Sequence, residues 1–310
     1  MTTILVTAIG GDVAQGVASV IREALPDWRI VGTDMNERHA GSLFCDRLLR
    51  APAASDPEYL DWLEGAVRSE GIDLCLPLSE AELERLWRDR RDTVGGAPVV
   101  SAGFKAVEIG NDKLTTSEFL RSIALPGPWT VADVDSLKGR FPCIYKPRRG
   151  AGSKSVFQCG SLDEAEFYAR HYPGGVFQEM LLPADSELTC AVFRSREGEV
   201  AVLVLARVLS GGLTSWAKVI EDEETKAQCV RIAEALNLRG AINIQLRLTA
   251  EGPRIFEINS RFSSTALIRH KLGFQDVEWT LKDMLGEEIS LRRPEPGTIG
   301  VRIQSATIFR

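Results

Sequence analysis

The chain has 310 residues, enough for two or three lobes, and its 44% hydrophobic and 26% charged residues are typical of a globular protein. The net charge of −6 disfavours nucleic acid as the main partner, because phosphate-backbone binding requires a basic surface. A small phosphorylated ligand in a local basic cleft remains compatible with it. No apolar run approaches the ~20 residues of a membrane span, and the first residues do not resemble a signal peptide.

The six cysteines have neither CxxC nor zinc-type spacing. Most of them lie inside apolar runs, which indicates reduced, buried thiols in a cytoplasmic protein. We therefore expect neither a membrane partner nor a disulfide framework.

Strands and helices alternate in the first third of the chain, as in a doubly wound α/β unit. The predicted elements, in order, are a strand at 4–8, a helix that follows the turn at 9–16 and runs through Leu25, and then residues 29–34, 57–70, 73–76, 80–88 and 97–100. This pattern predicts a Rossmann-like domain with a mainly parallel sheet over residues 1–102.

The glycine-containing turn at 9–16, together with Asp34 at the end of the second strand, raises the alternative of an NAD(P) oxidoreductase. Its spacing does not match G-x-G-x-x-G, so we favour a structural or substrate-facing role for the turn. An oxidoreductase would also leave the motifs of the second half unexplained.

The second half contains long β-runs with few helices. Its predicted elements are residues 113–123, 141–148, 156–159, 162–171, 175–182, 186–194, 199–209, 223–238, 241–248, 254–259, 264–272 and 299–304. Gly240 is expected to end the helix at 223–238.

A basic segment in this half suits an anion. Lys113 opens a helix, where a cation fits the helix dipole poorly and needs an anion or an acid nearby. Lys146 lies on a strand that leads into the loop 149–155, which is rich in small residues and positive charge. Small residues let backbone amides approach an oxyanion, so phosphate binding is favoured over a solvated turn.

The two runs 241–248 and 254–259 predict an antiparallel hairpin around the turn chemistry of 249–253. A symmetric register places Gln245 opposite Glu257 and Asn243 opposite Asn259, roughly 5 Å apart. A strict period of two separates the second strand into two faces: Ile255, Glu257 and Asn259, against Arg254, Phe256 and Ile258. With Arg261 beside them, the polar side chains indicate a hard-cation site next to an anion-binding arginine; a solvated polar face is the alternative.

Together these motifs resemble the ATP-grasp superfamily, and within it the branch of the carbamoyl-phosphate synthetase large subunit and the carboxylate–amine ligases. The most specific part is Phe256–Arg261, followed by the Lys146 strand and its loop. The resemblance implies a Rossmann-like lobe followed by a two-lobed ATP-grasp domain over 103–310, with a lid subdomain at about 140–182. The expected fold class is α/β, with an α+β second half.

The resemblance also implies roles for individual residues. Lys113 and Lys146 would contact the phosphates, with Lys146 also near the adenine, under a lid formed by Gly150, Ala151, Gly152 and Ser153. The adenine hinge would be Glu179, Met180, Leu181 and Leu182, and Glu187 would bind the ribose. Mg²⁺, with Mn²⁺ as an alternative, would be bound by Gln245, Glu257 and Asn259, and Arg261 would steady the transferred phosphoryl group or the acyl phosphate. Many relatives have an acid in place of Gln245, and Glu187 lies one residue further from the hinge than the family pattern predicts.

The implied activity is ATP-dependent joining of a carboxylate and an amine through an acyl phosphate. Arg261 and Lys146 would act in phosphoryl transfer, while Arg207 and Trp216 are candidates for substrate contacts, with ordinary packing as the alternative. No role is expected for His39, His171 or His270. Small-molecule substrates are the expected partners, a homodimer is compatible with the sequence, and carbamate phosphorylation or non-catalytic nucleotide binding are the other functions considered.

Overall fold

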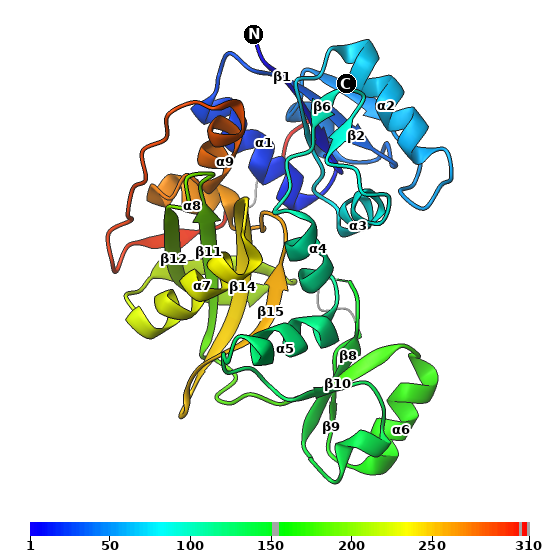
Figure 1. Ribbon diagram of the computed structural model, residues 1–310, viewed down its shortest axis with the longest axis vertical. Coiled ribbons are helices and arrows are strands. Elements are labelled where there is room, and N and C mark those ends of the chain that lie inside the picture. Colours follow the sequence, from blue (N-terminus) through cyan, green and yellow to red (C-terminus); the bar gives the residue numbers. More distant parts are fainter. Residues whose placement is uncertain (151–154, 304–305, 309–310) are drawn as a thin grey trace.

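The computed structural model describes residues 1–150, 155–303 and 306–308. Figure 1 shows three groups of elements: a blue and cyan unit at the N-terminal end, a larger sheet in yellow-green to orange, and a small green unit with β8, β9, β10 and α6. The predicted α/β class with an antiparallel second half is confirmed.

The N-terminal unit is a four-stranded parallel sheet in the order β3-β2-β1-β4. Its elements are β1 Thr3–Thr7, α1 Asp12–Ala24, β2 Arg29–Asp34, η1 Ala40–Leu43, β3 Arg47–Arg50, α2 Tyr59–Glu70, β4 Leu74–Leu76, α3 Glu80–Arg88, β5 Thr93–Val94 and β6 Ala97–Pro98. The strand predicted at 97–100 is shorter than expected: β6 pairs antiparallel with β5, and only Val99 forms a parallel bridge to the main sheet, at Cys75.

The next elements lead into the small sheet, which has the order β7-β10-β8-β9. They are α4 Phe104–Gly110, α5 Lys113–Ser122, β7 Thr130–Val131, η2 Asp135–Leu137, β8 Cys143–Pro147, β9 Phe157–Cys159, α6 Leu162–His171 and β10 Gly175–Glu179. Asp112 caps α5 through backbone amides of the first turn, and α6 has the predicted bounds.

The large sheet is antiparallel with the order β15-β14-β11-β12-β13-β16. Its segment contains β11 Glu187–Arg194, β12 Val200–Ser210, β13 Leu213–Val219, α7 Glu223–Leu236, β14 Gly240–Thr249, β15 Gly252–Asn259, α8 Ala266–Leu272, α9 Asp276–Leu285 and β16 Ile299–Val301. The predicted end of α7 was wrong: Asn237 adopts the left-handed conformation that ends the helix, and Gly240 already begins β14.

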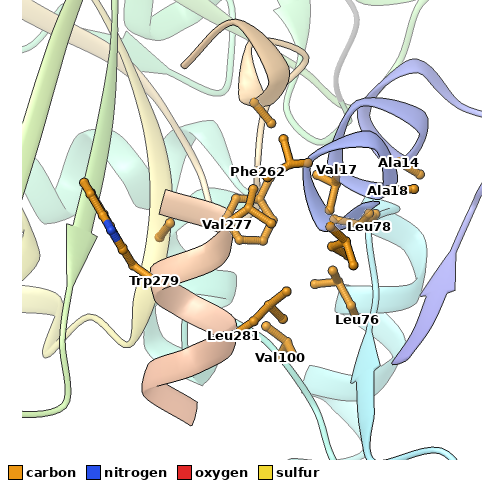
Figure 2. Packing of buried hydrophobic residues seen from close by; sticks show 14 of the residues in the cluster. Ala14, Val17, Ala18, Leu76, Leu78, Val100, Phe262, Val277, Trp279 and Leu281 are labelled. Atoms are coloured by element: carbon orange, nitrogen blue, oxygen red, sulfur yellow. The ribbon is translucent and has the colours of Figure 1, made fainter. Parts of the chain in front are cut away.

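One hydrophobic core joins the N-terminal unit to the large sheet. Side chains of α1 and β4, such as Val17 and Leu76, share a cluster with Phe262 and with Val277 and Leu281 of α9. Figure 2 shows these side chains meeting between the two units. Because the core is continuous, residues at the end of β15 are held close to the N-terminal unit.

Among the described residues, no helix is both long enough and apolar enough to cross a membrane.

Candidate active site

The hairpin of β14 and β15 has the predicted register, with Asn243 opposite Asn259 and Gln245 opposite Glu257. The strict alternation predicted for β15 was wrong. The register shifts next to Gln245, where one extra residue enters β15, so that Ile255 and Ile258 both face the core. Phe256 is then free to face the basic side chains, and its ring centroid lies 5.5 Å from Lys146 Nζ.

Glu257 and Asn259 lie side by side at the end of β15, where Asn259 Nδ2 donates to Glu257 Oε1 over 3.1 Å. A carboxylate and an amide oxygen are hard donors that fit Mg²⁺. The described residues contain no group of three or more His, Cys, Asp or Glu side chains that could hold a metal. Mg²⁺ is usually held by one or two protein oxygens together with phosphate and water oxygens, and the pair of Glu257 and Asn259 fits that pattern.

Gln245, the third residue expected at the metal, forms a hydrogen bond with another side chain of the large sheet. Its Oε1 accepts a hydrogen bond from Arg207 Nη2 at 2.7 Å. Both residues lie on the same side of the large sheet, on strands separated only by β11. This hydrogen bond takes up one of the two acceptor positions of the Gln245 oxygen, which weakens the case for Gln245 as a metal donor.

Lys146 lies on β8 of the small sheet and is 7% exposed. Burial lowers the pKa of Lys146 to about 8, although the nearby carboxylate of Glu257 opposes the shift. The small sheet thus places the Lys146 ammonium against the hairpin, where burial leaves its charge poorly solvated. An anionic ligand would restore the charged form.

Glu187, expected at the ribose, and Arg207, expected at the substrate, lie in one cluster rather than in separate sites. Arg207 Nε donates to Glu187 Oε1 at 3.0 Å, and Arg247 Nη2 donates to Glu187 Oε2 at 3.2 Å. All three side chains are largely buried. Trp216 is more distant, on β13, which β11 and β12 separate from β14.

Arg247 was not assigned a role from the sequence, although it lies two residues after Gln245 on β14 and alternation therefore places both on one face. Its Nη1 donates to the backbone oxygen of Leu181 at 2.8 Å. Arg247 thus connects the segment expected to bind adenine with the expected ribose carboxylate. The alternation of β14 was the signal that could have identified it.

The expected hinge 179–182 is anchored at its first residue. Glu179 forms an ion pair with Arg254 at 2.8 Å and accepts a hydrogen bond from the Trp129 amide at 3.2 Å. Met180 is half-buried, Leu181 is buried and Leu182 is exposed. The ion pair fixes the end of β10 to β15.

The basic loop follows an ion pair between Asp112 and Arg148. Asp112 accepts from Arg148 Nε at 2.8 Å, and this contact holds the pKa of the Asp112 carboxyl below its usual range even though burial opposes the shift. Lys113 Nζ donates to the Gly150 carbonyl at 2.9 Å. The first turn of α5 therefore contacts the first residues of the loop, while Ala151, Gly152 and Ser153 lie outside the described residues.

Arg261 follows β15 and points toward the N-terminal unit. Its Nη2 donates to Glu80 Oε1 at 3.0 Å, and its Nη1 donates to the backbone oxygen of Phe262 at 3.0 Å. Glu80 is the first residue of α3. No pattern in the sequence indicated this contact between the two halves of the chain.

The glycine-containing turn before α1 is filled by the chain's own side chains. Asp34 Oδ2 accepts from the Gly10 amide at 2.9 Å. A Cβ on Gly10 would meet the His39 ring at 2.6 Å. Of the structural and substrate-facing roles that the sequence left open for this turn, the packing supports the structural one, and it gives His39 a packing function that was not expected.

Two family models match the chain: "ATP-grasp in the biosynthetic pathway with Ter operon" over residues 178–307, and "PylC-like, N-terminal domain" over residues 4–99. A D-alanine–D-alanine ligase of Rhodococcus opacus (strain B4) is 27% identical over 209 residues, which are 56% of this chain and 56% of that protein. A carbamoyl-phosphate synthase of Methanobrevibacter smithii is 25% identical over 134 residues, 40% of this chain and 36% of the synthase. The chain thus spans about half or less of the length of these curated relatives.

The crystal structure of N5-carboxyaminoimidazole ribonucleotide synthetase from Thermus thermophilus superposes with a TM-score of 0.76 at 19% identity, over 95% of this chain and 81% of that one. This similarity shows a common fold. Together with the ATP-grasp family model over residues 178–307, it shows that the chain is similar to ATP-grasp proteins.

Proposed function

We propose that the chain is an ATP-dependent carboxylate–amine ligase that forms a C–N bond through an acyl phosphate and releases ADP and phosphate. The observation that best supports this proposal is the position of buried Lys146, on β8 of the small sheet. It lies against the hairpin that carries Glu257 and Asn259. A lysine whose burial disfavours its charge, next to hard oxygen donors, suits a nucleoside triphosphate bound with Mg²⁺.

Bound Mg·ATP would supply the phosphoryl group and the charge of the metal. Glu257 and Asn259 would hold the metal, and Lys113 and Lys146 would neutralise charge that develops on the phosphates. Arg261 would steady the transferred group while the substrate carboxylate attacks phosphorus. The substrate amine then attacks the acyl carbon, phosphate leaves, and the amine loses a proton. The chain needs no nucleophile of its own for either step.

The base and ribose of the nucleotide would lie over the segment 179–182 and Glu187. Arg247 supports this proposal because it contacts both the Leu181 carbonyl and the Glu187 carboxylate. Glu187 is shared with Arg207, so ribose hydroxyls would bind a carboxylate already oriented by two arginines. Solved relatives of this fold include a complex of N5-carboxyaminoimidazole ribonucleotide synthetase with ADP, which supports an adenine nucleotide here.

The proposal extends to the organisation of the chain. Residues 1–102 would be the N-terminal domain and 103–310 the ATP-grasp domain, with a lid at about 140–182, supported by the separate strand orders of the three sheets. The partners would be small carboxylates and amines, and a homodimer is compatible with this arrangement. A cytoplasmic location is supported by six cysteines that form no disulfide.

The test is ADP release with Mg·ATP, measured on carboxylates with and without amines. The panel includes D-alanine, other amino acids, and bicarbonate with ammonia. Amine-dependent ADP release with an amide product supports the ligase. Release with bicarbonate alone would favour carbamate or carboxylate phosphorylation of the carbamoyl-phosphate synthetase type. Tight Mg·ATP binding without turnover on any member would favour a non-catalytic nucleotide-binding protein.

Two variants test the residue assignments in the same assay. Glu257→Gln and Lys146→Ala should each abolish turnover while the circular dichroism spectrum of the folded protein is retained. Near-normal turnover in either variant would contradict the proposed site.

A further inference from the structure

We propose that Glu80, on the first helix turn of α3, is a positioning residue for Arg261. The inference rests on the proposed function, in which Arg261 steadies the transferred phosphoryl group. Glu80 belongs to the N-terminal unit, so the proposal makes that unit part of the phosphoryl-transfer machinery rather than a separate support.

The contact itself is a part-buried ion pair. Arg261 Nη2 lies 3.0 Å from Glu80 Oε1, and the side chains are 15% and 25% exposed. Ion pairs at this burial hold their geometry better than surface pairs, which are screened by solvent and cost side-chain entropy. The carboxylate therefore fixes the direction of a guanidinium whose only other hydrogen bond among the described residues is with the Phe262 carbonyl.

Both partners are also fixed through their neighbours in the chain. Phe262 follows Arg261, and Leu78 lies two residues before Glu80. Each is 4% exposed and belongs to the core that joins the two units. Figure 2 shows Leu78 and Phe262 in that core. Arg261, Leu78 and Phe262 also line the same small cavity of about 10 Å³, so there is little room for the junction to shift.

The local structure of α3 adds to this rigidity. Ser79 caps the helix, and its hydroxyl exchanges hydrogen bonds with Glu82 in a capping box. Glu82 in turn accepts from Thr7 Oγ1 at 2.6 Å and from the Tyr59 hydroxyl at 2.9 Å. The start of α3 is therefore tied to β1 and α2, and the Glu80 backbone cannot follow Arg261 if the arginine moves.

The two hydrogen bonds of the Arg261 guanidinium leave some of its N–H donors available for a ligand. Nη1 donates to the Phe262 carbonyl and Nη2 to Glu80. A guanidinium has five N–H donors, so two contacts leave donors available for phosphoryl oxygens. Holding two of its sides orients the others, which is how a supporting residue improves the placement of a transition-state contact.

The experiment compares Glu80→Gln with Glu64→Gln. Glu64, on α2, is a matched control because its side chain is 23% exposed and also pairs with arginines, Arg68 at 2.6 Å and Arg91 at 3.5 Å. With Mg·ATP and a substrate pair that the wild type turns over, Glu80→Gln should lower kcat roughly 10- to 100-fold and leave the KM for ATP unchanged. Glu64→Gln should change neither.

A second readout follows the guanidinium directly. In ¹⁵N-labelled protein, the Nε–Hε resonance of Arg261, assigned with Arg261→Lys, should broaden or shift toward free arginine in Glu80→Gln but not in Glu64→Gln. An unchanged kcat, an increased kcat or an unchanged resonance in Glu80→Gln would each overturn the proposal. If the wild type turns over no substrate pair, the proposed function fails, and the resonance comparison alone decides the contact between Glu80 and Arg261.

Discussion

The side chains of Arg207 and Gln245 are joined across the large sheet by a hydrogen bond of 2.7 Å from Nη2 to Oε1. Arg207 also holds Glu187 through its Nε at 3.0 Å. Arg207 thus donates hydrogen bonds to two side chains that were expected to bind different parts of the nucleotide complex, Glu187 the ribose and Gln245 the metal. The hairpin's remaining candidate metal donors are Glu257 and Asn259.

Replacement of Gln245 should therefore have little effect on metal binding. In the presence of ADP, Gln245→Leu should bind Mn²⁺ as tightly as the wild type, because the amide oxygen is committed to Arg207. Glu257→Gln should weaken Mn²⁺ binding at least about tenfold, because it removes the carboxylate of the donor pair. Electron paramagnetic resonance titration of free Mn²⁺ measures both. Equal losses in the two variants would show that Gln245 is a ligand.

The stability of the protein should depend on the protonation of Lys146. Its pKa in the folded state is about 8, below the 10.5 of an unperturbed lysine. Between these values the unfolded chain binds more protons, so the free energy of unfolding gains a contribution that rises with pH. From pH 7 to 9.5, the wild type should gain about 2 kcal/mol relative to Lys146→Met.

Urea unfolding of the two proteins at each pH measures that difference, and other titrating groups cancel because both proteins share them. A difference that stays constant over this range would mean that Lys146 keeps its ordinary pKa in the folded state.

Nucleotide binding should be coupled to the same proton. Phosphate oxygens next to Lys146 favour the charged form, which raises its pKa above the value of about 8 in the free protein. Near pH 8, binding of Mg·ADP should then take up about half a proton. Calorimetry in two buffers of different ionisation enthalpy measures the uptake. Lys146→Met is the control and should lack the proton uptake that comes from Lys146. Equal proton uptake in both proteins would show that another group takes up the proton.

Local sequence patterns predicted much of the hairpin formed by β14 and β15. The alternation of β14 and the turn at 249–253 were enough for the register that pairs Gln245 with Glu257. The bulge beside Phe256 was missed because a period of two cannot show where an extra residue enters a strand. β3 was missed because its residues, Arg47 to Arg50, alternate neither in polarity nor in burial.

Contacts between charged side chains were the least predictable part of the site. Glu80 and Arg261 are 181 residues apart, and Arg207 and Gln245 are 38 apart. Their geometry depends on how the sheets are packed together, which no local periodicity encodes. For the same reason, Arg207 and Glu187 could be identified as candidates, but their direct pairing could not.

A fully buried ion pair beneath the hairpin gives the last prediction. Arg269 of α8 and Asp276 of α9 are 0% and 1% exposed and lie 2.9 Å apart. Burial lowers the pKa of Arg269 and raises that of Asp276, while each partner opposes the other's shift. Asp276→Asn leaves a charge without its partner and should lower the free energy of unfolding by about 3–5 kcal/mol.

Asp283→Asn is the matched control, because Asp283 pairs with Arg196 at 3.8 Å and Arg196 is 55% exposed. Its loss should stay below about 1 kcal/mol. Arg269→Met combined with Asp276→Leu removes both charges and should recover most of the stability lost in Asp276→Asn, since neither desolvation penalty remains.

Arg269 also donates to the Ser263 hydroxyl and to Asn243, which faces Asn259 across the hairpin. If the ion pair serves only stability, the double variant should bind Mn²⁺ with ADP as the wild type does; weaker binding at full stability would show that Arg269 also holds the hairpin in place.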